Sequence, residues 1–496
     1  MSEPRPIDVV VVGAGVGGLA VAIRLRAAGH HVLVLERAAQ PGGKLAVRQR
    51  DGFTFDIGPS LITLPHVFDE LFRCAGSSLD EQVSMVRLDP QFRYHWPDGR
   101  TLVIGDDGCD QPGYRDFVAH GRQIWQVSER TFFAGPMSGP LSLFRRLRRP
   151  RDLTDIDPLR TLDASARRFF DDPHMVQWAG RYATYSGSSP YQAPATLGCI
   201  AHIEHQYGCW YPIGGLGAVR DALVRVARLA GVEIRCSTET VAITTSPGSD
   251  GSLCSDRRRM GRFGSRRREC ITGVTLADGS RLLADIVIAN ADAHHLYADL
   301  LPDQRALRRT QRATPSTSGF VVLAGVRGLT PGVGHHNVWF SADPRHEFAQ
   351  LRDGRLADDP TVYACVSAVT DPSQAPVGHE NWFLLVNTPA GAQVDRDAYC
   401  AVVFDRLRTA GIDLAPRLAF TETLTPNDFE QRYRSPGGAI YGTSSNGRRA
   451  AFVRPANRGA VPGLYLVGGS THPGGGLPVV TMGARIVADM IQADLR

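Results

Sequence analysis

The sequence VVVGAGVGGLAVAIRL at residues 10–25 decides the fold that this chain of 496 residues is expected to adopt. A run of valines, typical of a strand buried on both faces of a parallel sheet, leads into a glycine-rich turn and then an apolar segment of helical length. A second apolar run at residues 31–35 ends on Glu36. Strand, turn, helix and strand within about 30 residues form the βαβ unit of dinucleotide-binding folds. The sequence therefore predicts an α/β protein that begins with a nucleotide site.

The turn has the pattern G-x-G-x-x-G, in which each glycine serves a separate purpose. Gly13 permits the tight turn, Gly15 lets the backbone approach a pyrophosphate, and Gly18 lets the helix pack against the sheet. The pyrophosphate is expected at the helix N-terminus, where free N–H groups and the helix dipole favour negative charge. Glu36 is expected to accept hydrogen bonds from an adenosine ribose. A plain βαβ turn without a ligand is disfavoured, because all these pieces are in register.

Two further glycine segments indicate FAD rather than a nicotinamide dinucleotide. Residues 41–44 (PGGK) form a second turn soon after the first βαβ unit, and the chain continues to DIGPS at residues 56–60. Residues 463–470 (GLYLVGGS) combine a buried strand with a glycine turn, and the helix expected after them would direct its positive end toward a reduced flavin ring. Three separated segments around one extended nucleotide predict FAD, whose ribityl chain and ring reach past the first unit.

Composition and charge exclude several other classes of protein. Hydrophobic residues make up 43% of the chain and charged residues 21%, and the net charge of +5 is too small to indicate nucleic-acid binding. Lys44 is the only lysine, so lysine-dependent chemistry has one candidate. The nine cysteines contain no C-x-x-C motif, which predicts no metal site and favours a reducing cytoplasm. Neither a signal peptide nor a membrane-spanning stretch is recognised.

Motifs along nearly the whole chain resemble the bacterial-type phytoene desaturases and related FAD-dependent carotenoid desaturases. The motifs are VVVGAGVGGLAVAIRL (10–25), PGGK with GFTFDIGPSLIT (41–63), WYPIGGLGAV (210–219), ANAD (289–292) and GLYLVGGSTHPGGGLPVV (463–480). The last is the most diagnostic, because T-H-P-G-x-G-x-P in a C-terminal flavin segment is typical of this family. Three glycines at residues 474–476 and AIYGTSSN at 439–446 are more similar to late-acting desaturases and terminal oxidases of carotenoid chains.

The resemblance implies an α/β fold with a Rossmann-like FAD-binding domain of the amine-oxidase and GDI-like flavoprotein type. An interleaved α+β substrate domain and a helical region facing substrate and membrane complete the expected fold. The predicted division is 1–90, 206–300 and 451–496 for FAD binding, 91–205 for the helical region, and 301–450 for the substrate domain. Residues 246–268 are basic and glycine-rich; a solvated hairpin insertion is favoured there, and contact with an anionic surface is the alternative.

The predicted FAD-binding residues follow from the glycine segments and the resemblance together. They are Gly13, Gly15, Gly17, Gly18, Glu36, Arg37, Gly43, Lys44, Gly58, Pro59, Ser60, Val241, Gly468, Gly469, Ser470, Pro478, Val479 and Val480. His472 is the one weak candidate for a catalytic residue, as a group that orients substrate or relays a proton. A structural role is favoured for it, in which the ring caps the turn, because hydride abstraction from a hydrocarbon needs no strong base.

The reaction implied by the resemblance is flavin-dependent removal of hydrogen from an allylic C–C bond of a carotenoid or related isoprenoid. Hydride passes to the flavin and a proton leaves the adjacent carbon, so the protein supplies mainly orientation and a dry, apolar tunnel. The family also implies peripheral association with the cytoplasmic membrane. No second nucleotide motif is present for a nicotinamide, so oxygen or a quinone is the expected electron acceptor. Terminal oxidation and dehydrogenation of a hydroxylated carotenoid are the alternatives within the family.

Two rival functions share this fold. An amine oxidase is disfavoured, because Lys44 is the only lysine and residues 470–476 contain no aromatic residue. A prenyl-chain escort of the GDP-dissociation-inhibitor type is disfavoured by the intact nucleotide motifs. The segment 141–149 (LSLFRRLRR) mixes apolar and basic residues, which fits either an interfacial segment or an ordinary surface helix. It contains arginines where relatives have a proposed catalytic acid, so no acid or base is assigned.

Two further groups of side chains favour structural roles. His294 and His295 are expected to cap a helix rather than bind metal, because no carboxylate or cysteine lies at supporting spacing. Trp178, Tyr182 and Tyr185 lie near helical spacing, for which core packing is favoured over a tunnel lining.

Overall fold

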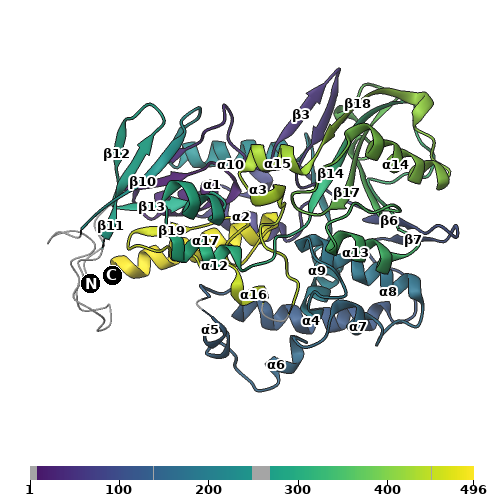
Figure 1. Cartoon of the computed structure of the whole chain (residues 1–496), viewed down its shortest axis with the longest axis horizontal. Coiled ribbons are helices and arrows are strands. Elements are labelled where there is room, and N and C mark those ends of the chain that lie inside the picture. The colour runs from purple at the N-terminus through teal and green to yellow at the C-terminus, as the bar shows by residue number, and fades with distance from the viewer. Residues whose placement is uncertain (1–7, 138, 248–268, 448–449) are drawn as a thin grey trace.

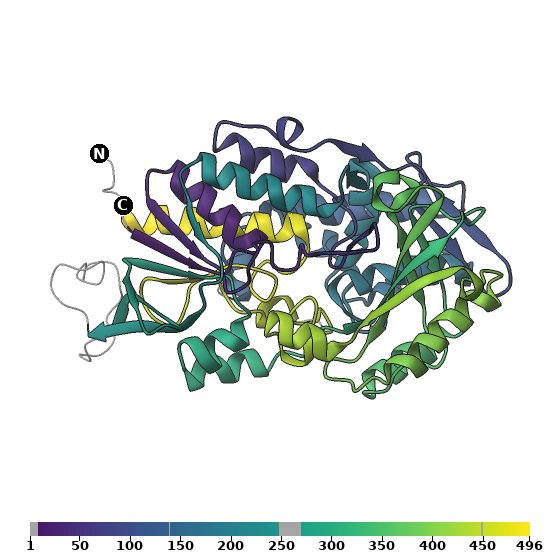
Figure 2. The same cartoon turned by 90° about the horizontal axis from the view of Figure 1, so that it is seen from above.

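A computed structural model describes residues 8–137, 139–247, 269–447 and 450–496 (Figure 1). A parallel sheet lies toward one end of the long axis and a larger mixed sheet toward the other, with a group of helices along one side. No helix in the described ranges combines the length and apolar character needed to cross a bilayer. The N-terminal strand and the C-terminal helix lie at the same end of the molecule in both views (Figures 1 and 2).

The parallel sheet unites three segments that are distant in sequence. Its strand order is β19-β13-β1-β2-β9, and every neighbouring pair is parallel. The strands are β1 (Asp8–Val12), β2 (His31–Leu35), β9 (Glu233–Arg235), β13 (Ile286–Ala289) and β19 (Leu464–Leu466). The central strand β1 therefore lies between strands from the middle and the start of the chain, as expected for a Rossmann-like unit.

Each face of this sheet is covered, which explains the nearly continuous apolar sequence of β1. Val9 and Val11 pack into the cluster that contains α1 (Val16–Ala27), α10 (Leu216–Leu229) and α17 (Leu477–Leu495). Val10 and Val12 face the other way, into a cluster with a three-stranded antiparallel sheet. That sheet consists of β10 (Thr240–Pro247), β11 (Glu269–Leu276) and β12 (Arg281–Leu283). Most of the predicted basic insertion at 246–268 lies outside the described residues, because only 246 and 247 are covered.

The second large sheet has seven strands in the order β18-β14-β17-β16-β15-β6-β7. All its pairs are antiparallel except that of β15 with β6. The strands are β6 (Phe92–His95), β7 (Thr101–Ile104), β14 (Ser318–Arg327), β15 (His336–Trp339), β16 (Val362–Val366), β17 (His379–Thr388) and β18 (Leu418–Leu424). The hairpin at residues 92–104, grouped with the helical region from sequence, thus shares a sheet with strands from residues 301–450.

Helices cover one face of the second sheet and fill the side of the molecule beneath both sheets (Figure 1). Tyr399, Val403 and Leu407 of α14 (Arg396–Thr409) pack on Phe320 and neighbouring strand residues. The helices beneath the sheets are α4 (Tyr114–Thr131), α5 (Pro140–Phe144), α6 (Asp152–Asp155), α7 (Leu162–Ala166), α8 (Pro173–Gly180) and α9 (Cys199–Tyr207). The remaining elements are β3 (Val47–Arg50), β4 (Phe53–Asp56), α2 (Pro65–Arg73), α3 (Leu79–Gln82), β5 (Met85–Arg87), β8 (Trp210–Pro212), α11 (Ala293–His295), α12 (Gln304–Gln311), α13 (Pro344–Arg352), α14 (Arg396–Thr409), α15 (Pro426–Tyr433) and α16 (Ala450–Val453).

The main elements predicted from sequence are present. The first strand leads into α1, which begins at Val16, so the glycine pattern itself enters the helix. The C-terminal helix follows the last glycine turn, as predicted, and begins at Leu477 with Pro478 in its first turn, where a missing N–H costs nothing.

Candidate functional site

The two N-terminal glycine turns contact each other. The N–H of Gly42 donates to the carbonyl of Ala14 at 2.8 Å, and a Cβ added at Gly43 would lie 3.2 Å from the Cα of Gly15. Both turns line the same cavity. The close approach leaves little room for a side chain at Gly43, and it brings bare backbone from both turns to one surface, as nucleotide binding requires.

Asn290, directly after β13, fills the space that these glycines leave. Its Nδ2 donates to the carbonyl of Gly13 at 3.1 Å. A Cβ added at Gly15, Gly17 or Gly468 would lie 2.9, 2.8 and 3.0 Å from the Asn290 side-chain amide, in that order. One asparagine thus links the N-terminal turn to the glycine turn after β19. The sequence motif ANAD included this residue, but no role was predicted for it.

Glu36 lies where an adenosine ribose is expected in a Rossmann-like site. Its Oε1 and Oε2 accept hydrogen bonds from the backbone N–H groups of Ala38 and Ala14 at 2.9 and 2.8 Å. Thr240 lines the cavity as well, and its buried Oγ1 has no hydrogen-bond partner within the described residues. A carboxylate with lone pairs to spare and an unpaired hydroxyl suit a ligand that carries its own hydroxyl groups.

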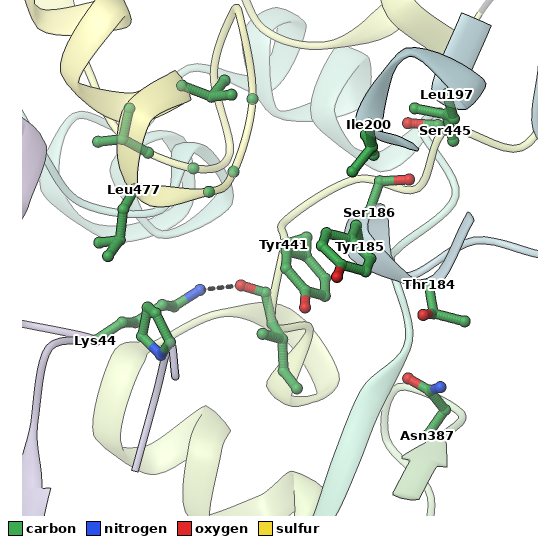
Figure 3. Close-up of a pocket in the computed structure, with 18 of the residues that line it drawn as sticks. Lys44, Thr184, Tyr185, Ser186, Leu197, Ile200, Asn387, Tyr441, Ser445 and Leu477 are labelled. Carbon is green, nitrogen blue, oxygen red and sulfur yellow. Dashed lines mark hydrogen bonds between the residues drawn. The ribbon is translucent and has the colours of Figure 1, made fainter. Parts of the chain in front are cut away.

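Lys44 and Arg454 supply positive charge at the other end of the nucleotide surface. The Lys44 ammonium donates to the carbonyl of Ile440 (Figure 3). Burial lowers the pKa of Lys44, and the carboxylate of Asp292 opposes this shift. Arg454 donates to the carbonyls of Gly469 at 2.7 Å and Thr443 at 2.8 Å. Burial lowers the pKa of Arg454 to about 10, which leaves it charged at neutral pH.

A single cavity of about 1270 Å³ connects the glycine turns with the second sheet. Sixteen of the eighteen predicted FAD residues line it, all except Gly18 and Val241. Gly18 instead faces the turn, where an added Cβ would lie 2.1 Å from the carbonyl oxygen of Gly13. The Val241 side chain is 43% exposed, whereas its neighbour Thr240 lines the cavity. The cradle of glycines, the unpaired hydroxyl and the length of the cavity together fit an extended dinucleotide such as FAD.

His472 lies behind the cavity wall rather than in it. Its side chain is buried and its Nε2 is 3.1 Å from the carbonyl of Gly135, while its ring packs edge-on against Phe132 with centroids 4.6 Å apart. Burial lowers the pKa of His472 to about 4, so the ring is neutral at neutral pH. These contacts fit the favoured structural role. The predicted capping role of His294 and His295 is wrong, because Asp292 caps the short helix α11 and its carboxylate accepts from the N–H of His294 at 2.8 Å. The two histidines lie within that helix, and Nδ1 of His295 is 2.6 Å from Oδ2 of Asp299.

Polar side chains gather on one part of the cavity wall, where Tyr441 lies next to Gly475 of the C-terminal glycine turn. Tyr185 and Tyr441 both line this part of the cavity, together with further hydroxyl and amide groups (Figure 3). The additional polar groups are Thr184, Ser186, Asn387 and Ser445. Leu197 and Ile200 line the same part of the cavity, so hydrogen-bonding groups and apolar side chains lie together there (Figure 3).

Behind this wall, a buried glutamate orders the two tyrosines predicted as core residues. Glu204 accepts hydrogen bonds from the hydroxyls of Tyr182 at 2.9 Å and Tyr185 at 2.5 Å. Burial raises the pKa of Glu204, although the nearby Arg181 and the two hydroxyls oppose that shift. Arg181 lies over the ring of Phe92 at 4.4 Å and lines the cavity. Tyr182 is therefore a packed core residue, as predicted, whereas Tyr185 both packs in the core and lines the cavity wall.

Comparison with known proteins assigns the chain to a family. Residues 16–491 match the model described as flavin containing amine oxidoreductase. The chain belongs to the flavin-containing amine oxidoreductase family. It is 35% identical over 510 residues to a 4,4'-diapolycopene oxygenase of a Methylomonas species, with 98% of each chain covered. It is 31% identical over 509 residues to a 4,4'-diaponeurosporene oxygenase of Staphylococcus aureus (strain MRSA252), again with 98% of each covered.

Solved structures share the fold at low identity. An oxidoreductase from Methanosarcina mazei gives a TM-score of 0.61 at 17% identity, over 97% of this chain and 99% of the other. A putrescine oxidase variant gives a TM-score of 0.65 at 14% identity, over 99% of this chain and 98% of the other. The predicted fold class, the FAD cofactor and the resemblance to carotenoid-modifying flavoenzymes are thereby confirmed. The chain is an FAD-dependent oxidoreductase.

Proposed function

We propose that this oxidoreductase acts on a long acyclic polyene of the carotenoid type and oxidises one end of it. The two relatives named above are oxygenases of such molecules and match this chain from end to end. The observation that favours oxidation at an end is the set of polar groups around Tyr185 and Tyr441 on the cavity wall. A hydrocarbon without oxygen gains nothing from these groups, whereas a terminal alcohol or aldehyde can form hydrogen bonds with them.

The rest of the cavity suits an apolar chain. Phe132, Phe133, Leu143, Ile156 and Ile203 line the part next to the helical region. Burying a polyene against such side chains stabilises the complex by about 25 cal/mol for each Å² of apolar surface removed from water. When bound, FAD supplies a two-electron oxidant. A terminal methyl group that loses a hydride to it takes its oxygen atom from one water molecule, whose proton goes to solvent, and the chain's residues contribute binding and orientation. The reoxidant we propose is oxygen or a quinone.

Desaturation of an internal bond is the second candidate, because the apolar part of the cavity can hold a polyene without any hydrogen bond. Desaturation of a polyene needs orientation more than acid–base catalysis, and the buried, neutral His472 does not reach the cavity. An amine substrate is not favoured, because the buried Lys44 already donates to a backbone carbonyl. The two oxidations differ in product, so one experiment can separate them.

The deciding experiment expresses the chain in hosts that accumulate phytoene, neurosporene, lycopene, diaponeurosporene or diapolycopene, with pigments analysed by mass spectrometry. Terminal oxidation gives products that gain oxygen, whereas desaturation gives products that only lose pairs of hydrogen atoms. Unchanged pigment in every host would contradict both proposals. Tyr441→Phe removes one hydroxyl from the cavity wall and should lower the yield of oxygenated product while flavin content stays constant. Tyr207→Phe, a tyrosine outside the cavity lining, is the matched control.

We also propose that the protein approaches its substrate from the cytoplasmic membrane surface. Leu141 and Phe144 of α5 are 64% and 51% exposed, and the arginines of residues 145–149 follow them. Leu143 of the same helix is buried and lines the cavity. A segment with apolar anchors outside and the cavity wall inside offers a route by which an apolar substrate can leave a bilayer without crossing water.

A further inference from the structure

Three buried side chains that the proposed reaction does not use meet at the junction of β15 and β16. His336 is the first residue of β15 and the register partner of Cys365 in β16, and His335 directly precedes this strand. One ligand atom from each of the three lies within 4.8 Å of the others. Their exposures are 3%, 1% and 5% in that order, so water does not compete for them. Two imidazoles and a thiol are the donor set of metal ions that prefer nitrogen and sulfur.

The hydrogen bonds of both imidazoles leave one ring nitrogen free. Nδ1 of His335 is 2.7 Å from Oγ1 of Thr370, and Nδ1 of His336 is 2.8 Å from the hydroxyl of Tyr363. The Nε2 atoms of both rings are buried and have no hydrogen-bond partner among the described residues. A hydroxyl that accepts from Nδ1–H fixes the lone pair on Nε2, which is how histidines are oriented as metal ligands. Unpaired buried nitrogens are otherwise costly, by about 1–3 kcal/mol each.

We propose that His335, His336 and Cys365 bind a transition-metal ion that prefers nitrogen and sulfur ligands, zinc(II) or copper(I). The ion forms a bond to the Cys365 sulfur as the thiol loses its proton to solvent, and one bond to each imidazole. No redox change is involved. The bound ion would link β15 to β16 through His336 and Cys365. The site also adjoins the cavity, because the hydroxyl of Tyr363 is hydrogen-bonded to His336 and, at 2.6 Å, to the cavity residue Ser60.

Sequence spacing alone does not reveal this site. The adjacent pair at 335–336 and a cysteine 29 residues beyond His336 do not form a recognised zinc spacing. Strand pairing alone brings them together. The metal site is independent of the proposed substrate, so either proposal can fail without the other.

The test measures metal in the flavin-loaded protein purified from cells grown with added zinc and copper. The ligands are buried, so the ion has to enter during folding, and soaking the finished protein is not sufficient. We expect about one ion per chain that resists dialysis against a chelator, and X-ray absorption at the zinc or copper edge should show a sulfur neighbour at about 2.3 Å for zinc. The edge that gives the signal distinguishes the two metals. Wild-type protein without stoichiometric metal would overturn the proposal.

Variants locate the ion. Cys365→Ser should lose the sulfur neighbour and lower metal retention at least about tenfold, and His336→Gln should lower retention similarly. Cys209→Ser removes another buried cysteine, outside the cluster, and should retain the metal. Flavin content and circular dichroism report whether each variant folds. Metal that persists in both ligand variants would overturn the assignment, and if neither variant folds, the sulfur and nitrogen neighbours in the wild-type spectrum decide it.

Discussion

Replacing Gly15 with alanine should separate FAD binding from folding. Gly15 has φ −72°, which alanine adopts without strain. Its added Cβ would meet only the side-chain Nδ2 of Asn290, at 2.9 Å, because no other atom of the described chain lies that close. The same Cβ would extend from a backbone surface that lines the cavity, where the pyrophosphate is expected.

The magnitudes differ between the two effects. The free energy of unfolding of the apoprotein should change by less than about 1 kcal/mol. The asparagine amide can shift to make room, and alanine restricts the conformations of the unfolded chain. FAD affinity should fall about 100-fold, which is about 2.7 kcal/mol. The stabilisation that FAD at 100 times its wild-type Kd gives to the folded state, also about 2.7 kcal/mol, should largely disappear.

The assay is urea unfolding of Gly15→Ala and wild type, each with and without FAD, together with flavin titration. Gly18→Ala is the contrasting variant, because its Cβ would lie 2.1 Å from a backbone carbonyl, and it should destabilise even the apoprotein by about 1–3 kcal/mol. If Gly15→Ala keeps wild-type FAD affinity, the N-terminal loop does not bind the pyrophosphate, and the FAD site assigned to this loop is wrong.

Three further outcomes are expected. Arg454→Met removes a buried cation that donates to the carbonyls of Gly469 and Thr443, so FAD affinity and the free energy of unfolding should both fall, the latter by about 3 kcal/mol in urea titrations. Burial lowers the folded-state pKa of His472 from 6.5 to about 4, so the neutral ring stabilises the fold above pH 6.5. The free energy of unfolding should therefore fall by about 2 kcal/mol between pH 6.5 and 5, and His472→Gln should lack this pH dependence. Leu141→Ser with Phe144→Ser should reduce co-sedimentation with anionic vesicles at least about tenfold, whereas unchanged binding would contradict an interfacial role for α5.

The part of the site that could be predicted from sequence is the part set by local backbone geometry. The glycine pattern, Glu36 and the C-terminal glycine turn follow from short motifs, because each imposes its conformation within a few residues. Asn290 and Arg454 could not be predicted in the same way, since their roles depend on which strands become neighbours. Strands β6 and β7 show the same limit: the sequence places them with the helical region, because the parallel pairing of β6 with β15 depends on a segment more than 200 residues away.

The dependence of the glycines on Asn290 can itself be measured. A Cβ at Gly17 would lie 2.8 Å from Oδ1 of Asn290 and 3.0 Å from a methyl of Val480, so Gly17→Ala should destabilise the apoprotein. Asn290→Ala should also destabilise it, because the carbonyl of Gly13 loses its donor. The double variant removes the collision with the amide, so its cost should be smaller than the sum of the two by about 1 kcal/mol. Strict additivity in urea unfolding would show that the glycines and the asparagine are independent, and that the turn is shaped by its own sequence alone.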